Sequence, residues 1–389
     1  MKKVLLSLSM MVLTGTMAFA QYYHFCLPNT GNNPNNINQE DMEYPLGGGL
    51  PTTWFTILSS AQPLGTLSSW QSIPFNFDFN GSAVDSFRVT NTGILTFSQK
   101  LSPTSHSAAN LVPINHSSVP DSSICVLGIN GSGASDNVVS KLFGTAPNRQ
   151  QWITFSSFSA TGTAASHWTY WSIVLEETTN NIYIVDQKTA NATPIVNIGI
   201  RVNSSNYDQI LQVAAQADND PTPANNTYYT FAQGNQPDYD IEGVELNVDR
   251  YLVLGSSPYL ISADFLNNGS QNITSCTFSY SIDNLTPVTS NISNTNLPSC
   301  GLATIASSTS WTPSTSGSYV IKVWLDGLNG SNVDSYPFND TVTKLVQVIN
   351  APTARYPLYE TFTSSTCPPC VLGNTTLENL FSGNPGKSN

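Results

Sequence analysis

Apolar and polar residues alternate with a period of two in short runs along most of this chain. In the clearest run, between Ile73 and Phe79, every second residue is apolar, and an Asn-Gly turn follows. A period of two places one face of a strand against a core and the other face in water. Many short strands that turn residues separate predict an antiparallel sandwich or barrel rather than alternating strands and helices. Further runs occur at 87–90, 94–97, 152–158, 168–176, 182–185 and 196–202.

The first half of the chain predicts one β-sandwich domain. Residues 170–176 and 182–185 flank an Asn-rich turn, which is typical of a hairpin. The strand IPFNFDF at 73–79 and the segment VTNTGILTF at 89–97 resemble the secreted β-sandwich modules of bacterial surface proteins. We therefore expect a jelly-roll-like sandwich at 51–235, after an Asn-, Gly- and Pro-rich lead-in at 21–50.

A second β-sandwich is expected at 236–350. Alternation resumes after residue 237 and continues in short strands up to about residue 349, which fits an immunoglobulin-like sandwich. The phrases ISADFLNNGS at 261–270 and GSYVIKVWLDGLNG at 317–330 resemble bacterial adhesion-type immunoglobulin-like repeats. That resemblance implies a spacer or a binding surface.

The N-terminus has the pattern of a secretory signal. Lys2 and Lys3 precede an apolar run at 4–13, and the small residues that follow end in Ala-Phe-Ala at 18–20. We expect residues 1–20 to be removed before Gln21. The apolar run is interrupted by polar residues and no later segment is long enough to span a bilayer, so we expect no transmembrane helix.

Composition supports an exported protein without a nucleic-acid partner. The chain has 389 residues, of which only 10% are charged, against about 25% in average soluble proteins. Its 25 acidic residues outnumber its 13 Lys and Arg, so the net charge is -12. Phosphate binding needs clustered Lys and Arg, which excludes a nucleic-acid partner. The localisation we expect is extracellular, at the cell surface or associated with the outer membrane.

The six cysteines are predicted to lie in an oxidising compartment, where disulfides persist. Cys276 and Cys300 stand in two neighbouring β-type segments, and we expect them to form a structural disulfide. For Cys26 and Cys125 the sequence allows either a pair or two buried free thiols.

The C-terminal residues 351–389 have a different pattern. A predicted strand at 356–362 precedes Cys367-Pro-Pro-Cys370, and apolar residues at 377, 380 and 381 indicate a short helix. Strand, C-x-x-C and helix open a thioredoxin fold. The string YETFTSSTCPPCVLGNTTLENLF resembles the start of the thioredoxin-like domain in a family of secreted and outer-membrane proteins from Bacteroidetes, which join such a domain to β-sandwich modules.

That resemblance implies thiol-disulfide exchange with protein thiols or disulfides. A helix N-terminus stabilises a thiolate, so Cys367 would attack and Cys370 would resolve the mixed disulfide. A local structural disulfide and a metal half-site are the alternatives, but zinc needs two more ligands, and the four histidines show no paired spacing. We expect no cofactor and no metal. Only the first strand and helix of the domain are present, so we expect a truncated chain whose exchange activity is lost or weak.

Two other groups of side chains are candidates for chemistry. Alternation places Trp168 and Tyr170 on one strand face and Trp171 in the core, so an exposed pair at 168 and 170 could stack on sugar rings. This is the alternative function: a non-enzymatic adhesin or carbohydrate-binding surface protein whose partners are surface glycans. The adjacent carboxylates Glu176 and Glu177 point to opposite faces, and we expect both to be solvated.

Overall fold

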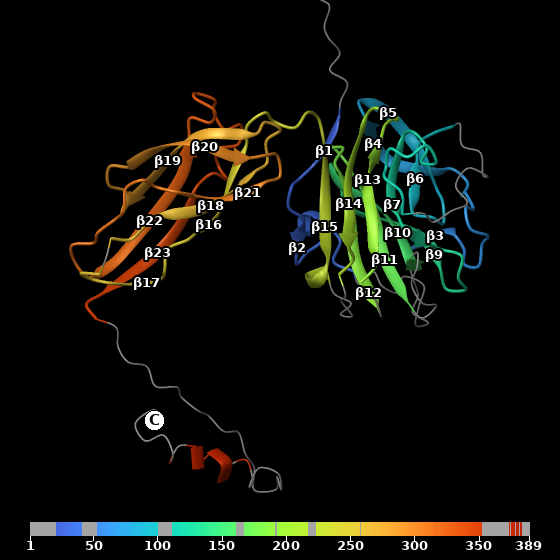
Figure 1. The fold of residues 1–389 in the computed structure, drawn as a ribbon. Coiled ribbons are helices and arrows are strands. Elements are labelled where there is room, and N and C mark those ends of the chain that lie inside the picture. The colour runs from blue at the N-terminus through green and yellow to red at the C-terminus, as the bar shows by residue number, and fades with distance from the viewer. Residues whose placement is uncertain are drawn as a thin grey trace, which may run out of the picture. The chain divides into compact units, whose positions relative to one another are not determined.

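The structure is a computed structural model that contains two compact units, each of which is described by itself (Figure 1). The first unit ends at Asp238 and also includes Asn268–Ser270, and the second begins at Tyr239. The structure describes residues 21–40, 53–99, 111–160, 167–190, 193–216, 223–256 and 258–351, together with helical positions between Gly373 and Ser382.

The first unit is an antiparallel sandwich of two sheets. The larger sheet has nine strands in the order β1-β15-β12-β11-β10-β9-β3, with β2 beside β15 and β8 beside β10. Its strands are β1 (Tyr22–His24), β2 (Asn29–Thr30), β3 (Phe55–Leu58), β8 (Ile129–Asn130), β9 (Asn137–Thr145), β10 (Asn148–Ala160), β11 (Trp168–Glu176), β12 (Ile182–Ala190) and β15 (Thr227–Gln233). The six-stranded sheet, in the order β14-β13-β7-β6-β5-β4, contains β4 (Gln71–Phe79), β5 (Ser82–Val89), β6 (Ile94–Thr96), β7 (Ser123–Leu127), β13 (Ile195–Arg201) and β14 (Tyr207–Ala214).

One hydrophobic core joins the two sheets. The apolar residues of β4 alternate with polar ones and all point inward, as the sequence predicts, and Phe77 is 1% exposed. From the larger sheet, Phe155 and Trp171 enter the same core and are fully buried. Each such side chain stabilises the fold by roughly 1.5–3 kcal/mol relative to an exposed one. The predicted antiparallel sandwich is therefore confirmed.

Strand β1 contacts both edge strands of the six-stranded sheet. The Tyr22 hydroxyl donates to the Asp78 carbonyl of β4 at 3.4 Å, and His24 Nδ1 lies 2.8 Å from the Asp208 carboxylate of β14. In a flat sheet of six strands these edges would be about 24 Å apart, because neighbouring strands lie roughly 4.8 Å apart. The sheet must therefore curl strongly, as sheets do when they approach a barrel.

The free edge of β4 is covered by side chains from the larger sheet. Arg149 Nη1 donates to the Pro74 carbonyl at 3.0 Å, and the Asp78 amide donates to Asn180 Oδ1 at 2.9 Å. An open strand edge is a site for unwanted pairing, and proline together with side-chain contacts is a usual protection. Pro74 and these two contacts close the edge.

The turn between β5 and β6 requires a glycine. Gly93 has a φ of +82°, and a Cβ at this position would lie 1.9 Å from the Val126 carbonyl oxygen. Beside it, the buried Asn91 accepts a hydrogen bond from the Gly65 amide at 2.8 Å and donates one to the Gly131 carbonyl at 3.2 Å. The sequence predicts a turn at Asn91-Thr92-Gly93, and in the structure Asn91 also connects the loops that contain Gly65 and Gly131.

The second unit is a smaller sandwich with its own core. Phe265 and Phe278 meet edge to face, with ring centroids 6.3 Å apart, and both are fully buried. The unit has β16 (Ile241–Leu246), β18 (Ser262–Asn267) and β21 (Leu302–Ala306) in one sheet, and β17 (Tyr251–Val253), β23 (Val342–Ile349), β22 (Gly317–Asp326), β19 (Ile273–Ile282) and β20 (Val288–Leu297) in the other. Only the β17–β23 pair is parallel among these described strands. A second β-sandwich is thus confirmed.

In the part of the chain that the structure describes, no helix has both the length and the apolar character needed to cross a membrane.

Candidate functional site

The predicted disulfide between Cys276 and Cys300 is wrong, because Cys276 is a buried free thiol whereas Cys300 is disulfide-bonded. In the β19–β20 hairpin, Cys276 faces Ile292, and Ile273 faces Leu297. Cys276 therefore lies three residues, or about 10 Å, from the open end of the hairpin, where Ile273 pairs with Leu297. Cys300 lies still further along, and a disulfide needs Cα atoms within about 7 Å.

Cys26 and Cys125 also differ in state. Cys26 is disulfide-bonded, while Cys125 is a fully buried free thiol, so the two do not pair. Burial raises the pKa of the Cys125 thiol far above its usual value and the pKa of Cys276 to about 11. Because the thiolate is the reactive form, both free thiols are inert at neutral pH.

Cys367 and Cys370 lie outside the described residues. Helical backbone follows them at positions that include Leu377 and Leu380, where the sequence predicts a short helix. Among the residues described, no three His, Cys, Asp or Glu side chains form a group that could hold a metal ion.

Trp168 and Tyr170 lie on the face of β11 opposite the core, and the prediction that Trp171 is a core residue is confirmed. Tyr170 is nevertheless buried, at 3% exposed, and it meets the Trp168 ring edge to face at 5.7 Å. Lys188 Nζ lies over one face of the half-buried Trp168 ring, 5.1 Å from its centroid. The pair therefore does not present two free ring faces to a ligand.

The expectation that Glu176 is solvated is wrong. Its carboxylate is buried and accepts hydrogen bonds from Asn35 at 2.6 Å, Gln150 at 2.9 Å, Thr179 at 2.6 Å and the Tyr183 hydroxyl at 2.8 Å. Such a set of donors satisfies a buried carboxylate without a cation. Burial, with Glu176 adding to it, raises the pKa of Tyr183. Two of these donors, Asn35 and Gln150, are distant in sequence from Glu176, which is why strand alternation could not reveal the cluster.

Its neighbour Glu177 forms an ion pair with Arg149. Arg149 Nε and Nη2 donate to the two carboxylate oxygens at 2.7 and 2.6 Å. A two-pronged pair of this kind is geometrically specific. It holds the guanidinium beside β4, where Arg149 also reaches Pro74.

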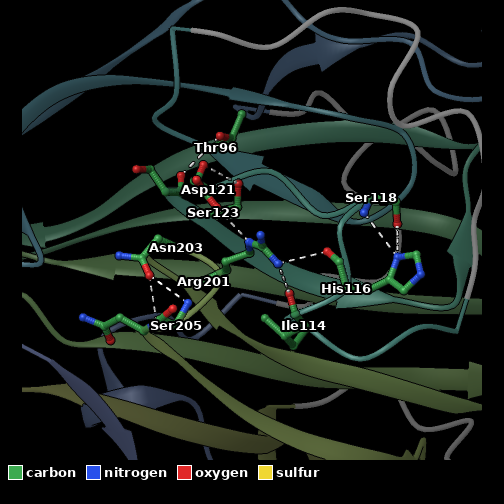
Figure 2. Close-up of polar contacts among 11 residues, drawn as sticks. Thr96, Ile114, His116, Ser118, Asp121, Ser123, Arg201, Asn203 and Ser205 are labelled. Carbon is green, nitrogen blue, oxygen red and sulfur yellow. Dashed lines mark hydrogen bonds and ion pairs between the residues drawn. The ribbon is translucent and has the colours of Figure 1, made fainter.

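A buried arginine fixes the loop that precedes β7, as Figure 2 shows. Arg201 of β13 is 5% exposed, and its Nε donates to Asp121 at 2.9 Å. Its Nη1 donates to the backbone carbonyls of His116 at 2.9 Å and Ile114 at 3.3 Å. The guanidinium thus replaces water at three acceptors and ties the loop to the sheet.

His116 and Ser118 in the same loop have the residue types of a base and a nucleophile, but no carboxylate among the described residues is hydrogen-bonded to the His116 ring. The Ser118 hydroxyl lies 2.8 Å from His116 Nδ1, and the Ser118 amide donates to the same nitrogen at 3.2 Å (Figure 2). A catalytic base needs a carboxylate that orients its ring. The nearby Asp121 is bound to Arg201 instead, so the arrangement is a turn.

Asp186 is a buried carboxyl that is only half satisfied. It is 1% exposed, and it faces Trp171 across the β11–β12 pair. Its Oδ2 accepts a hydrogen bond from the Gln216 amide at 2.8 Å, but Oδ1 has no partner. Burial raises the pKa of Asp186 to about 8. At neutral pH most molecules therefore hold this side chain protonated.

A family model matches part of the first unit. Residues 53–237 match the model of the family described as NIDO related. No curated protein matches the chain. The matched residues begin before β3 and end after β15.

Solved structures give distant likenesses. A domain described as part of a cell surface protein from Methanosarcina acetivorans is 23% identical and covers 30% of this chain and 98% of its own, with a TM-score of 0.24. A CARDB domain from Pyrococcus furiosus is 18% identical and covers 30% of this chain and 97% of its own, with a TM-score of 0.21. An extracellular domain of a hybrid two-component system from B. thetaiotaomicron is 11% identical and covers 55% of this chain and 29% of its own, with a TM-score of 0.16. Each TM-score lies below 0.5, so these likenesses indicate neither function nor partner.

The protonation of Asp186 predicts a pH dependence of stability. Its pKa is about 8 in the folded chain and has an ordinary value of 3.8, so the folded state keeps a proton that the unfolded state releases between these values. The free energy of unfolding should therefore fall as pH rises from about 4 to about 8, by up to about 1.4 kcal/mol per pH unit. Urea unfolding of the wild type and of Asp186→Asn at several pH values measures this dependence, because the asparagine side chain does not titrate. Parallel pH profiles for the two proteins would contradict it.

Proposed function

We propose that this chain is an exported, multi-domain β protein of the cell surface, whose two sandwich units serve as non-enzymatic spacers or binding modules. The observation that carries the proposal is that Cys26 and Cys300 are each disulfide-bonded. Disulfides persist in oxidising compartments outside the cytosol and are rare inside it. The secretory pattern at 1–20 and the scarcity of charged residues support the same location.

This proposal predicts a surface-exposed chain with two classes of cysteine. Intact source cells should be labelled with a membrane-impermeant biotin reagent, and the recovered chain alkylated in denaturant without reduction. We expect biotinylation, alkylation of Cys125 and Cys276, and no alkylation of Cys26 and Cys300 until a reductant is added. A chain that stays inside the cell, with Cys26 and Cys300 both alkylated, would rule the proposal out.

The motif at Cys367 and Cys370 supports a narrower proposal, thiol-disulfide exchange with a protein partner. We expect the full chain to reduce insulin with dithiothreitol at a slow rate that Cys367→Ser lowers to background, because Cys367 would carry the mixed disulfide. Cys125→Ser is the matched control, since that thiol is buried and inert. Equal rates for the wild type and Cys367→Ser would exclude exchange at this motif.

Carbohydrate binding is the other narrower proposal, and Trp168 supports it because its ring is only half-buried. If it is correct, Trp168→Ala should reduce retention on immobilised neutral oligosaccharides at least tenfold, because the packing of a sugar ring on an indole face is lost. Phe338→Ala, which removes an aromatic ring that is 88% exposed in the other unit, is the control. Retention that both variants keep would contradict a role for Trp168.

A further inference from the structure

Gln21 directly follows the expected cleavage site and directly precedes strand β1. Residues 1–20 lie outside the described residues, and their sequence ends in Ala-Phe-Ala, the small-residue pattern of a secretory cleavage site. Cleavage there converts the amide nitrogen of Gln21 into a free α-amine. That amine and the side-chain carboxamide then belong to one residue, at the spacing that closes a five-membered ring. The uncleaved chain lacks this reactive pair.

The backbone of Gln21 is fixed, whereas the residue as a whole is exposed to solvent. The Gly234 amide donates to the Gln21 carbonyl at 2.6 Å, which continues the pairing of β1 with β15 by one residue (Figure 1). A Cβ at Gly234 would meet no atom within 4 Å, so the space on that side is open. The Gln21 side chain therefore lies at an open end of the strand pair, where it is free to rotate onto its own α-nitrogen.

Ring closure uses no atom that holds β1 in place. The α-nitrogen of Gln21 attacks the side-chain carbon Cδ, a new C–N bond forms, and the bond from Cδ to the side-chain nitrogen breaks. That nitrogen leaves as ammonia with one proton from the α-amine, so the reaction is balanced without a co-reactant. The ring contains N, Cα, Cβ, Cγ and Cδ, and the carbonyl that accepts from Gly234 lies outside it. The lactam therefore keeps the register of β1.

The α-amine that the ring removes stands in front of the strand that closes the first unit. Tyr22 bonds to β4, and His24 lies 2.8 Å from Asp208 of β14. Chain termini are preferred sites of proteolysis, and an aminopeptidase needs a free α-amine to begin. Loss of residues 21–24 would delete both contacts. A lactam at residue 21 denies such an enzyme its starting point.

We propose that Gln21 is a modification site, at which the mature chain carries an N-terminal pyroglutamate that protects β1. The inference rests on the export proposed above, because cleavage after Ala20 is what frees the Gln21 amine. It adds the first residue of the mature chain, the bond that forms there and the strand that the bond protects. The modification also removes one terminal charge.

Mass spectrometry of the full chain recovered from source cells tests this. The amines of the intact protein are first dimethylated, which labels an open Gln21 before digestion can close it. After reduction, cleavage before Asp41 releases residues 21–40, which contain no lysine and no other aspartate. We expect this peptide to carry no dimethyl label and to be lighter than its encoded sequence by one ammonia.

Gln21→Asn is the matched control, because it keeps a side-chain amide but is one methylene shorter, so closure would require a strained four-membered ring. We expect its peptide to be fully labelled and to have lost no ammonia. Incubation of the folded proteins with a broad-specificity aminopeptidase should remove N-terminal residues from this variant and leave the wild type intact. Urea unfolding confirms that the variant folds.

The possible failures can be told apart. A labelled wild-type peptide of full mass that begins at Gln21, or a mature chain that begins at a later residue, would overturn the pyroglutamate and leave export intact. A chain that retains residues 1–20 would overturn both. Equal resistance of the wild type and Gln21→Asn to the aminopeptidase would overturn the protection of β1.

Discussion

The first unit depends on how strand β1 closes the six-stranded sheet. Through Tyr22 and His24 this short strand contacts β4 on one side and β14 on the other. An open sheet edge exposes unpaired backbone groups, and these contacts bring both edges of the curled sheet next to β1. Arg149 and Asn180 complete the closure at β4. In the same region β4 and β5 lose register, because residues 73–76 of β4 lie opposite residue 85 alone.

Two buried charged groups of the first unit, Glu176 and Arg201, have partners that include residues distant in sequence. Glu176 collects donors from four residues, and Arg201 serves three acceptors around one loop. Removing one partner from such a cluster leaves a desolvated group that costs about 1–3 kcal/mol. These clusters therefore specify the positions of loops and strand ends. Asp186 differs because one of its oxygens has no partner and burial keeps it protonated.

The four described cysteines are of two kinds, buried free thiols and disulfide-bonded residues. Cys125 and Cys276 are buried among apolar residues of two separate cores, where they behave as small hydrophobic side chains. Cys26 and Cys300 are bonded. Residue spacing suggested a different pairing, because it measures distance along the chain, whereas the β19–β20 register decides which Cα atoms come within reach.

The sequence by itself determined the fold class, the inward face of β4, the core position of Trp171 and the glycine turn at Gly93. These features follow from a period of two and from a backbone angle that only glycine adopts readily, and both are local properties. Tertiary structure alone decided the burial of Tyr170 and Glu176, the state of each described cysteine and the loss of register between β4 and β5. Each of these depends on which distant strands become neighbours and in which register, and alternation within a single strand carries no information about that.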